Sequence, residues 1–276
     1  MSFEIKESLL LGKQNDPLLC EDSIYTNANF AAVVDGATSK TNFLFDNKTP
    51  GKIASQLVVQ AISKFERETT AENAVLLINK EIYAFYKDNN LVDMMKNNKL
   101  NRFNACAAIY SDYNKEIWLI GDCQCIANKI NHNNEKKIDS ILAEVRSLYL
   151  NMLMKDGALV SDLLSNDLGR DYIIPLLKKQ NYFQNTDDTS EYSYGLFDGF
   201  QLNFADVIKV KSNDNEIILA TDGYPKLLNN LIDCEIYLKN VLVNDPLCIS
   251  MYKSTKGVVG DNLSYDDRAF IKIIAD

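Results

Sequence analysis

The amino-acid sequence predicts an α+β protein in which antiparallel sheets carry helices on their outer faces. The expected strands come in runs and the expected helices in pairs, rather than alternating one by one. No G-x-G-x-x-G segment follows a strand, as it would in a parallel nucleotide-binding sheet. A length of 276 residues, of which 46% are hydrophobic, suits one large domain or two small ones with a sizeable buried core.

The N-terminal third predicts two strands followed by two helices. Residues 2–11 and 23–34 are dense in apolar side chains, which favours strands. A Thr-Pro pair at 49–50 is typical of a helix start, and the apolar residues after it recur with helical period. Thr69 and Glu72 match a capping box, which predicts the start of the second helix.

The rest of the chain predicts further strands and helices around one irregular stretch. Residues 104–130 have the short apolar runs of a strand meander, and 139–155 return to helical period. Residues 156–204 are the least regular part, rich in Asn, Asp and Tyr. The C-terminal segments are expected to be two strands, a helical region and a last strand, at 206–211, 216–222, 224–243 and 268–274.

Five short acidic motifs lie where these apolar runs begin or end. They are Glu21-Asp22, Asp35-Gly36, Asp122, Asp222-Gly223 and Asp266-Asp267. Carboxylates at strand ends can converge in one cleft, and so many of them cannot stay ionised there unless cations neutralise them. Hard oxygen ligands select Mg²⁺ or Mn²⁺. The sequence therefore predicts an oxygen-ligated metal site.

The order of these motifs resembles that of the metal-dependent serine/threonine protein phosphatases (PPM, or type 2C). The matching stretches are CEDS at 20–23, VVDGATS at 33–39, LIGDCQC at 119–125, LATDGY at 219–224 and DDRAFI at 266–271. The resemblance implies one phosphatase-like domain over residues 1–276, with a variable, flap-like insertion at about 156–204. It also implies a four-layer α-β-β-α sandwich, in which two antiparallel sheets lie face to face with helix pairs outside.

The resemblance further implies that two Mn²⁺ or Mg²⁺ ions bind the acidic motifs. Asp35 would bridge the ions, with Glu21 and the carbonyl of Gly36 completing one site and Asp222 with Asp266 the other. Two such ions acidify a bridging water and clamp a phosphate. Asp35 and Asp222 would thereby position the water that attacks phosphorus.

Two further acidic residues have supporting roles in the family that the chain resembles. Asp22 would accept hydrogen bonds from metal-bound waters, and Asp122 matches a ligand of a third, weaker ion. Asp261-Asn262 is an alternative to Asp266, which we favour because the last expected strand begins two residues later. A single Asp-Gly pair is most often a turn, and Asp198-Gly199 is interpreted as one.

The chain departs from the family pattern at positions that would meet the phosphate. Ala37 follows the first Asp-Gly pair, and the sole histidine, His132, lies in a polar run and is interpreted as a solvated loop residue. The arginine that many members place before the acidic pair is missing, since the first arginine is Arg67. Lys13 is the nearest cation, and either binds phosphate or is a plain strand-end residue. Arg170 either reaches the substrate or forms a surface ion pair.

The amino-acid composition indicates which binding partners and which cellular compartment to expect. A net charge of −9 argues against nucleic acid, and no apolar stretch is long enough to span a membrane. The N-terminal residues lack the features of a signal peptide. Six cysteines without disulfide or metal spacing predict a reduced, cytoplasmic protein, and Cys123 and Cys125 are expected to be buried. The oligomeric state has no sequence signal.

Together these features predict a metal-dependent phosphatase of phosphorylated proteins. Water between two Mn²⁺ or Mg²⁺ ions would attack the phosphorus of phosphoserine or phosphothreonine in line. No Cys-x5-Arg segment supplies a cysteine nucleophile, so no phosphoenzyme is expected. Two alternatives stay open: a catalytically silent family member that acts as a binding or regulatory module, and a phosphatase of small phosphorylated metabolites.

Overall fold

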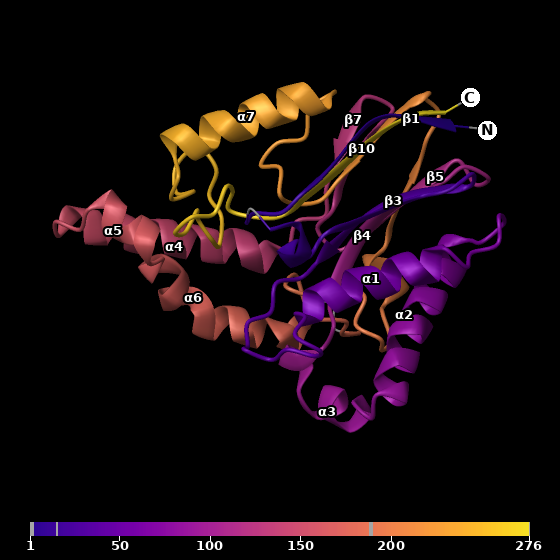
Figure 1. Cartoon of the computed structure of the whole chain (residues 1–276), viewed down its shortest axis with the longest axis horizontal. Helices are drawn as coiled ribbons and strands as arrows, with labels where there is room; N and C mark the ends of the chain where they lie inside the picture. The colour runs from indigo at the N-terminus through magenta and orange to yellow at the C-terminus, as the bar shows by residue number, and fades with distance from the viewer. Residues whose placement is uncertain (1–2, 15, 188–189, 276) are drawn as a thin grey trace.

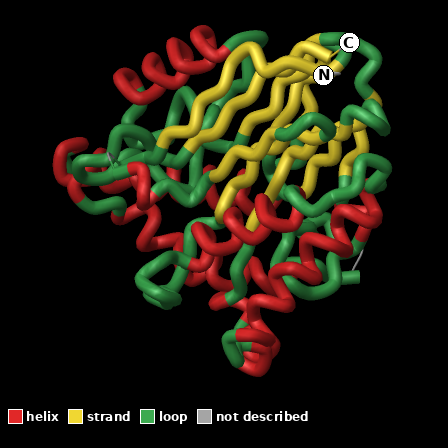
Figure 2. Tube along the Cα trace, turned by 45° about the vertical axis from the view of Figure 1, so that its right-hand side comes forward, coloured by secondary structure: helices red, strands yellow, loops and turns green. Residues whose placement is uncertain are grey.

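Two antiparallel sheets of five strands each lie face to face in the computed structural model, which describes residues 3–14, 16–187 and 190–275 (Figures 1 and 2). The first sheet contains, in spatial order, β1 (Phe3–Leu11), β10 (Arg268–Ala275), β9 (Glu216–Ala220), β6 (Gln124–Ala127) and β7 (Ile130–His132). The second contains β2 (Ser23–Thr26), β3 (Phe30–Gly36), β4 (Ala105–Ser111), β5 (Glu116–Ile120) and β8 (Ile208–Lys211). The expected α+β sandwich with facing antiparallel sheets is confirmed.

The core lies on both faces of the second sheet. Along β3, Ala31 and Val33 pack into the cluster between the sheets, while Ala32 and Val34 pack into the cluster beneath the helices. Side chains alternate between the faces of a strand, so a strand covered on both sides is apolar at every position. This explains the unbroken apolar run FAAVV in a sheet that is antiparallel.

Helices α1 (Pro50–Ile62) and α2 (Ala71–Asp88) pack together on the outer face of the second sheet, followed by the short α3 (Val92–Asn97). Thr49 caps α1 as expected, because its hydroxyl accepts from the backbone N–H of Lys52. The cap of α2 is Thr70 rather than Thr69. Thr69 belongs to the preceding turn, where its N–H bonds to the carbonyl of Glu66.

The first sheet is covered by α7 (Leu231–Asn244), which packs on it through Cys234 and Leu238 (Figure 1). Beside this face α4 (Lys137–Lys155) pairs with α6 (Leu168–Lys179), and α5 (Val160–Ser165) connects them. The stretch 156–204, expected to be irregular, thus includes α5 and α6. None of the helices in the described part of the chain has the length and apolar character that crossing a bilayer needs.

Three expected segments divide differently in the structure. Residues 23–34 form two strands, because the side chain of Asn27 accepts from the N–H groups of residues 29 and 30 and turns the chain. Residues 104–130 are not one meander, since β4 and β5 belong to the second sheet while β6 and β7 belong to the first. Likewise β8 and β9 lie in different sheets.

Gly121 is where the chain crosses from one sheet to the other. Its φ is +73°, and a Cβ built there would lie 2.1 Å from Sγ of Cys106, so only glycine fits. After this crossing His132 lies in β7, opposite Cys125 of β6, and is half-buried. The interpretation of His132 as a loop residue was wrong, because the strand Ile130–His132 is too short to show a periodic pattern.

Candidate active site

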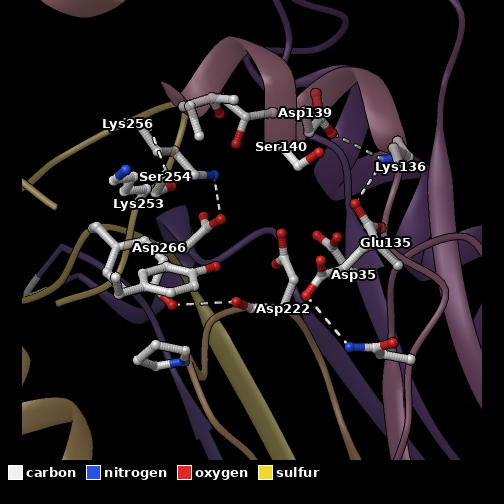
Figure 3. A pocket seen from close by; sticks show the side chains of 18 of the residues that line it. Asp35, Glu135, Lys136, Asp139, Ser140, Asp222, Lys253, Ser254, Lys256 and Asp266 are labelled. Carbon is white, nitrogen blue, oxygen red and sulfur yellow. Dashed lines mark hydrogen bonds and ion pairs between the residues drawn. The ribbon is translucent and has the colours of Figure 1, made fainter. Parts of the chain in front are cut away.

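Four of the predicted acidic residues line one cavity of about 420 Å³: Asp35, Asp122, Asp222 and Asp266. They come from the ends of β3, β5 and β9 and from the residues just before β10. Ala220, near the end of β9, pairs with Phe270, near the start of β10, so antiparallel pairing brings Asp222 and Asp266 together. Figure 3 shows the side chains of Asp35, Asp222 and Asp266 converging on the cavity.

The carboxylates of Asp35 and Asp222 receive no hydrogen bond from any residue that the structure describes. Burial raises the pKa of Asp35 well above its usual value, and the nearby charges of Asp22 and Asp122 add to this. Burial and the charge of Asp35 raise the pKa of Asp222 in the same way. Each group therefore favours a proton unless a cation supplies the missing positive charge.

Asp266 differs because two lysines contact it. Nζ of Lys13 lies 3.5 Å from Oδ1 of Asp266, and the ammonium of Lys256 contacts Oδ2. Burial would raise the pKa of Asp266, but the charges of Lys256 and Lys13 outweigh it and lower the pKa. Both carboxylate oxygens of this predicted metal ligand thus already have cationic neighbours.

Asp267 binds the backbone at Lys13 and at Glu21, and so fixes both segments next to the adjacent Asp266. Its Oδ1 accepts from the N–H of Lys13 at 2.7 Å, and its Oδ2 accepts from the N–H of Glu21 at 2.9 Å. Nζ of Lys13 also lies 3.4 Å from Oδ2 of Asp267 and 3.6 Å from Oε2 of Glu21. Lys13 is therefore placed among predicted metal ligands, beyond the end of β1, and its predicted contact with phosphate stays a prediction.

Glu21, Asp22 and Gly36 lie behind the cavity wall rather than on it. The two oxygens of Glu21 accept from the hydroxyls of Thr49, at 2.6 Å, and Thr38, at 2.8 Å. Burial and the charges of Asp266 and Asp267 raise the pKa of Asp22, whose Oδ2 accepts from the hydroxyl of Thr221 at 2.8 Å.

Gly36 lies where β3 meets the first turn of α1. A Cβ on Gly51 would lie 2.8 Å from both Oε1 of Glu21 and the carbonyl oxygen of Gly36. Glycine at position 51 therefore lets these two predicted ligand oxygens lie side by side against the start of α1. Neither residue lines the cavity.

Asp122 is bound by a lysine that the sequence did not reveal. Its Oδ2 accepts from Nζ of Lys136 at 2.7 Å, while its Oδ1 is buried without a hydrogen-bond partner among the described residues. The pKa of Asp122 is lowered, since the charge of Lys136 outweighs the effect of burial. Ligand atoms of Asp35, Cys106 and Asp122 lie within 4.8 Å of one another.

The acidic motifs carry more negative charge than the three lysines that contact them. Seven carboxylates face three ammonium groups: Glu21, Asp22, Asp35, Asp122, Asp222, Asp266 and Asp267 against Lys13, Lys136 and Lys256. The acidic motifs therefore hold more carboxylates than these lysines pair with, and divalent cations can neutralise the remainder. The free oxygens of Asp35 and Asp222 fit such ions, whereas a cation on Asp266 would share it with Lys13 and Lys256.

Other predicted positions lie elsewhere. Asp261, the alternative to Asp266, is exposed and does not line the cavity. Asp198-Gly199 is a turn as expected, with φ of +83° at Gly199, and Asp198 is fully buried against Arg102. Cys123 and Cys125 are buried free thiols, as expected.

Sequence reasoning missed Lys136, Lys256 and Lys40, and left the role of Arg170 open. All four line the cavity. Lys40 and Lys256 lie in loops, and Lys136 directly precedes α4, where a lysine is most often a solvated residue. No motif distinguishes them, so only the tertiary contacts reveal these cations.

No family model and no curated protein sequence matches the chain. Solved structures similar to it include the serine/threonine phosphatase PstP/Ppp of Mycobacterium tuberculosis, at 12% identity and a TM-score of 0.49, covering 100% of both chains. A second is the catalytic domain of PstP in complex with two manganese ions, at 11% identity and a TM-score of 0.49, covering 99% of both chains. A third is PppA, a regulatory component of the T6SS in Pseudomonas aeruginosa, at 9% identity and a TM-score of 0.48, covering 100% of this chain and 99% of that chain. Each of these similarities extends over nearly the whole length of the chain.

Proposed function

We propose that this chain is a metal-dependent phosphatase that hydrolyses phosphoserine or phosphothreonine in phosphorylated proteins. The observation that carries the proposal is the pair Asp35 and Asp222, two half-buried carboxylates that face one cavity and receive no hydrogen bond from the residues that the structure describes. Such groups are stabilised as anions by a hard divalent cation. The excess of carboxylates in the acidic motifs over the lysines that contact them agrees with this.

Asp35 and Asp222 would hold the Mn²⁺ or Mg²⁺ ions from the cavity wall, together with Asp266. Glu21 and the carbonyl of Gly36 would support them from behind, and Asp122 would hold a third ion. When bound, the ions would lower the pKa of a water molecule and neutralise the phosphoryl oxygens. Asp22, oriented by the hydroxyl of Thr221, would orient water on the inner side of the cluster.

We further propose one domain over the whole chain, in which the segment 156–204 borders the active site as a flap. Arg170, Leu177 and Gln180 of this segment line the cavity and thereby support that role. A reducing, cytoplasmic setting agrees with six free, buried cysteines in the described chain.

A second candidate function is a catalytically silent binding module. The specific observation in its favour is that Lys13 and Lys256 both contact Asp266. Two ammonium groups on one predicted ligand reduce the need for a metal ion there. A site whose carboxylates are neutralised by lysines would bind phosphorylated partners without hydrolysing them.

The deciding experiment is hydrolysis of a phosphothreonine peptide and of p-nitrophenyl phosphate, with Mn²⁺ or with a chelator, alongside calorimetric titration of Mn²⁺. We expect metal-dependent turnover that Asp222→Asn reduces at least about 100-fold. Asp261→Asn is the matched control, because it removes an equally charged carboxylate outside the cavity, and it should retain turnover. Mn²⁺ binding without turnover would favour the silent module, and absence of Mn²⁺ binding would refute the metal centre.

A further inference from the structure

Six cationic side chains line the cavity, and most of them already contact other groups of the protein. They are Lys40, Lys136, Arg170, Lys226, Lys253 and Lys256. Carboxylates bind three of these: Lys136 contacts Asp122, Lys253 contacts Glu144 and Lys256 contacts Asp266. Lys226 is exposed, with its ammonium 5.7 Å from the ring centre of Tyr237. Lys40 and Arg170 remain.

Lys40 has neither a hydrogen bond nor an ion pair to any residue that the structure describes, although it is half-buried. It lies in the loop that follows Asp35 and Gly36, so the same segment carries a candidate metal ligand and this free cation. An ammonium group without a partner in a partly buried site is costly unless a ligand supplies the anion.

Arg170 is held in place but not neutralised. Its Nη1 donates to the carbonyl oxygen and to the hydroxyl of Thr255, both at 2.9 Å. Thr255 immediately precedes Lys256, which contacts Asp266, so this bond anchors the guanidinium beside the acidic cluster. The other N–H groups of the guanidinium have no acceptor among the residues that the structure describes.

The electrostatics of the two cations agree with an anion site. Burial lowers the pKa of Lys40, the charge of Asp139 opposes this, and the charges of Arg170, Lys136 and Lys256 add to it, so that the pKa is about 8. Burial also lowers the pKa of Arg170. Like charges gathered in a partly buried cavity repel one another, and a bound dianion would relieve that repulsion.

We propose that Lys40 and Arg170 bind the phosphate group of a phosphate monoester and hold it against Asp35 and Asp222. Arginine suits the role because its planar guanidinium can donate two parallel hydrogen bonds to one phosphate. Lys40 adds a point charge from the side of the Asp-Gly loop. The choice of a monoester rests on the proposed function, whereas binding of the phosphate itself does not require turnover.

The test is calorimetric titration with inorganic phosphate of the full chain and of Lys40→Gln and Arg170→Gln, in chelator and in Mn²⁺. Each substitution should weaken phosphate binding about tenfold or more, as expected for a charge-assisted hydrogen bond. Lys48→Gln and Lys178→Gln are matched controls, since they remove the same charge from exposed positions in the same loop and in the same helix, and should bind like the wild type. Lys40→Arg, which keeps the charge, should recover part of the affinity.

Hydrolysis assays separate this inference from the proposed function. If the enzyme turns over, both cavity variants should raise KM for a phosphothreonine peptide and for glycerol phosphate more than they lower kcat. Unchanged KM together with unchanged phosphate affinity would overturn the anion site while leaving the phosphatase intact. Phosphate binding that depends on Lys40 and Arg170 in a protein without turnover would support the anion site and refute hydrolysis. Absence of saturable phosphate binding by the wild type would also overturn the inference.

Melting temperatures show whether a variant loses phosphate binding because it no longer folds correctly. Lys40→Gln should melt at or above the wild-type temperature, because it removes a repelled charge that has no protein partner. A large loss of stability in both Lys40→Gln and Lys40→Arg would mean that Lys40 has a structural role, which would contradict the inference.

Discussion

Gly36 ends β3 at a point where no side chain has room. A Cβ there would lie 2.4 Å from the carbonyl oxygen of Gly51 and 2.6 Å from that of Glu21. Both are backbone atoms, so Gly36→Ala must shift β3 or the start of α1. We expect it to lower the free energy of unfolding by about 2–3 kcal/mol in urea denaturation.

Gly12→Ala is the control for that substitution. The nearest atom to a Cβ at Gly12 is Cβ of Cys20 at 3.2 Å, which requires only a small adjustment. Its cost should stay below about 1 kcal/mol. Equal losses at the two positions would contradict a role for the close approach of β3 and α1.

Arg102 and Asp198 form a buried ion pair that the sequence analysis did not foresee. Nη1 of Arg102 lies 2.9 Å from Oδ2 of Asp198, which is wholly buried. Arg102→Leu would leave that carboxylate with the amide of Gln184 and the N–H of Phe200 as donors. We expect a loss of about 3–5 kcal/mol in the free energy of unfolding.

The exposed Arg67 provides the comparison. It stacks over the ring of Tyr113 at 5.2 Å and faces solvent. Arg67→Leu should cost no more than about 1 kcal/mol, as expected for an exposed cation–π contact. A similar loss at both arginines would show that the Arg102 pair contributes no special stability.

At the scale of elements, Glu235 joins α7 to β10. It accepts from Nε and Nη2 of Arg268 at 2.7 and 2.9 Å, and from the hydroxyl of Tyr224 at 2.8 Å. Burial would raise the pKa of Glu235, but these hydrogen bonds outweigh it and lower the pKa below 4.5. The folded state therefore binds this proton less well than the unfolded state, so the bonds stabilise the fold above about pH 4.5 and lose their effect as pH falls through the folded pKa.

Glu235→Gln should consequently cost about 1 kcal/mol at pH 7, with the half-exposed position keeping the loss small. The difference from wild type should shrink as the pH falls below about 4. Urea denaturation across this pH range measures it. Glu216→Gln, an exposed position near Lys272, should show no such trend. A pH-independent loss at Glu235 would refute the ionic contribution.

At the scale of the whole molecule, the surplus of carboxylates predicts that divalent ions stabilise the fold. A ligand that binds only the folded state adds about 2.7 kcal/mol at a concentration of 100 times its Kd. We expect Mn²⁺ to raise the melting temperature of the wild type and of Asp261→Asn. Asp222→Asn should lose most of the shift. A wild-type melting temperature unmoved by Mn²⁺ would contradict the proposed metal centre.

The sequence by itself determined the elements and the places where acidic residues end them. Periods of two and of 3.6 residues arise from neighbours along the chain, so α1 and β10 were predicted within a few residues. Thr49-Pro50 marked the start of α1 for the same local reason. The Asp-Gly motifs were visible because each interrupts an apolar run.

Only the tertiary structure decided which sheet each strand joins and which cations meet the carboxylates. Pairing of β6 with β9, or of β10 with β1, joins residues far apart in sequence, and local patterns are the same for either sheet. The lysines that contact Asp122 and Asp266 lie in segments without period, so their burial depends on the packing around them. Lys40, in the loop after β3, and Arg170, in α6, line one cavity although they lie far apart in the sequence, and no short motif encodes such a long-range arrangement.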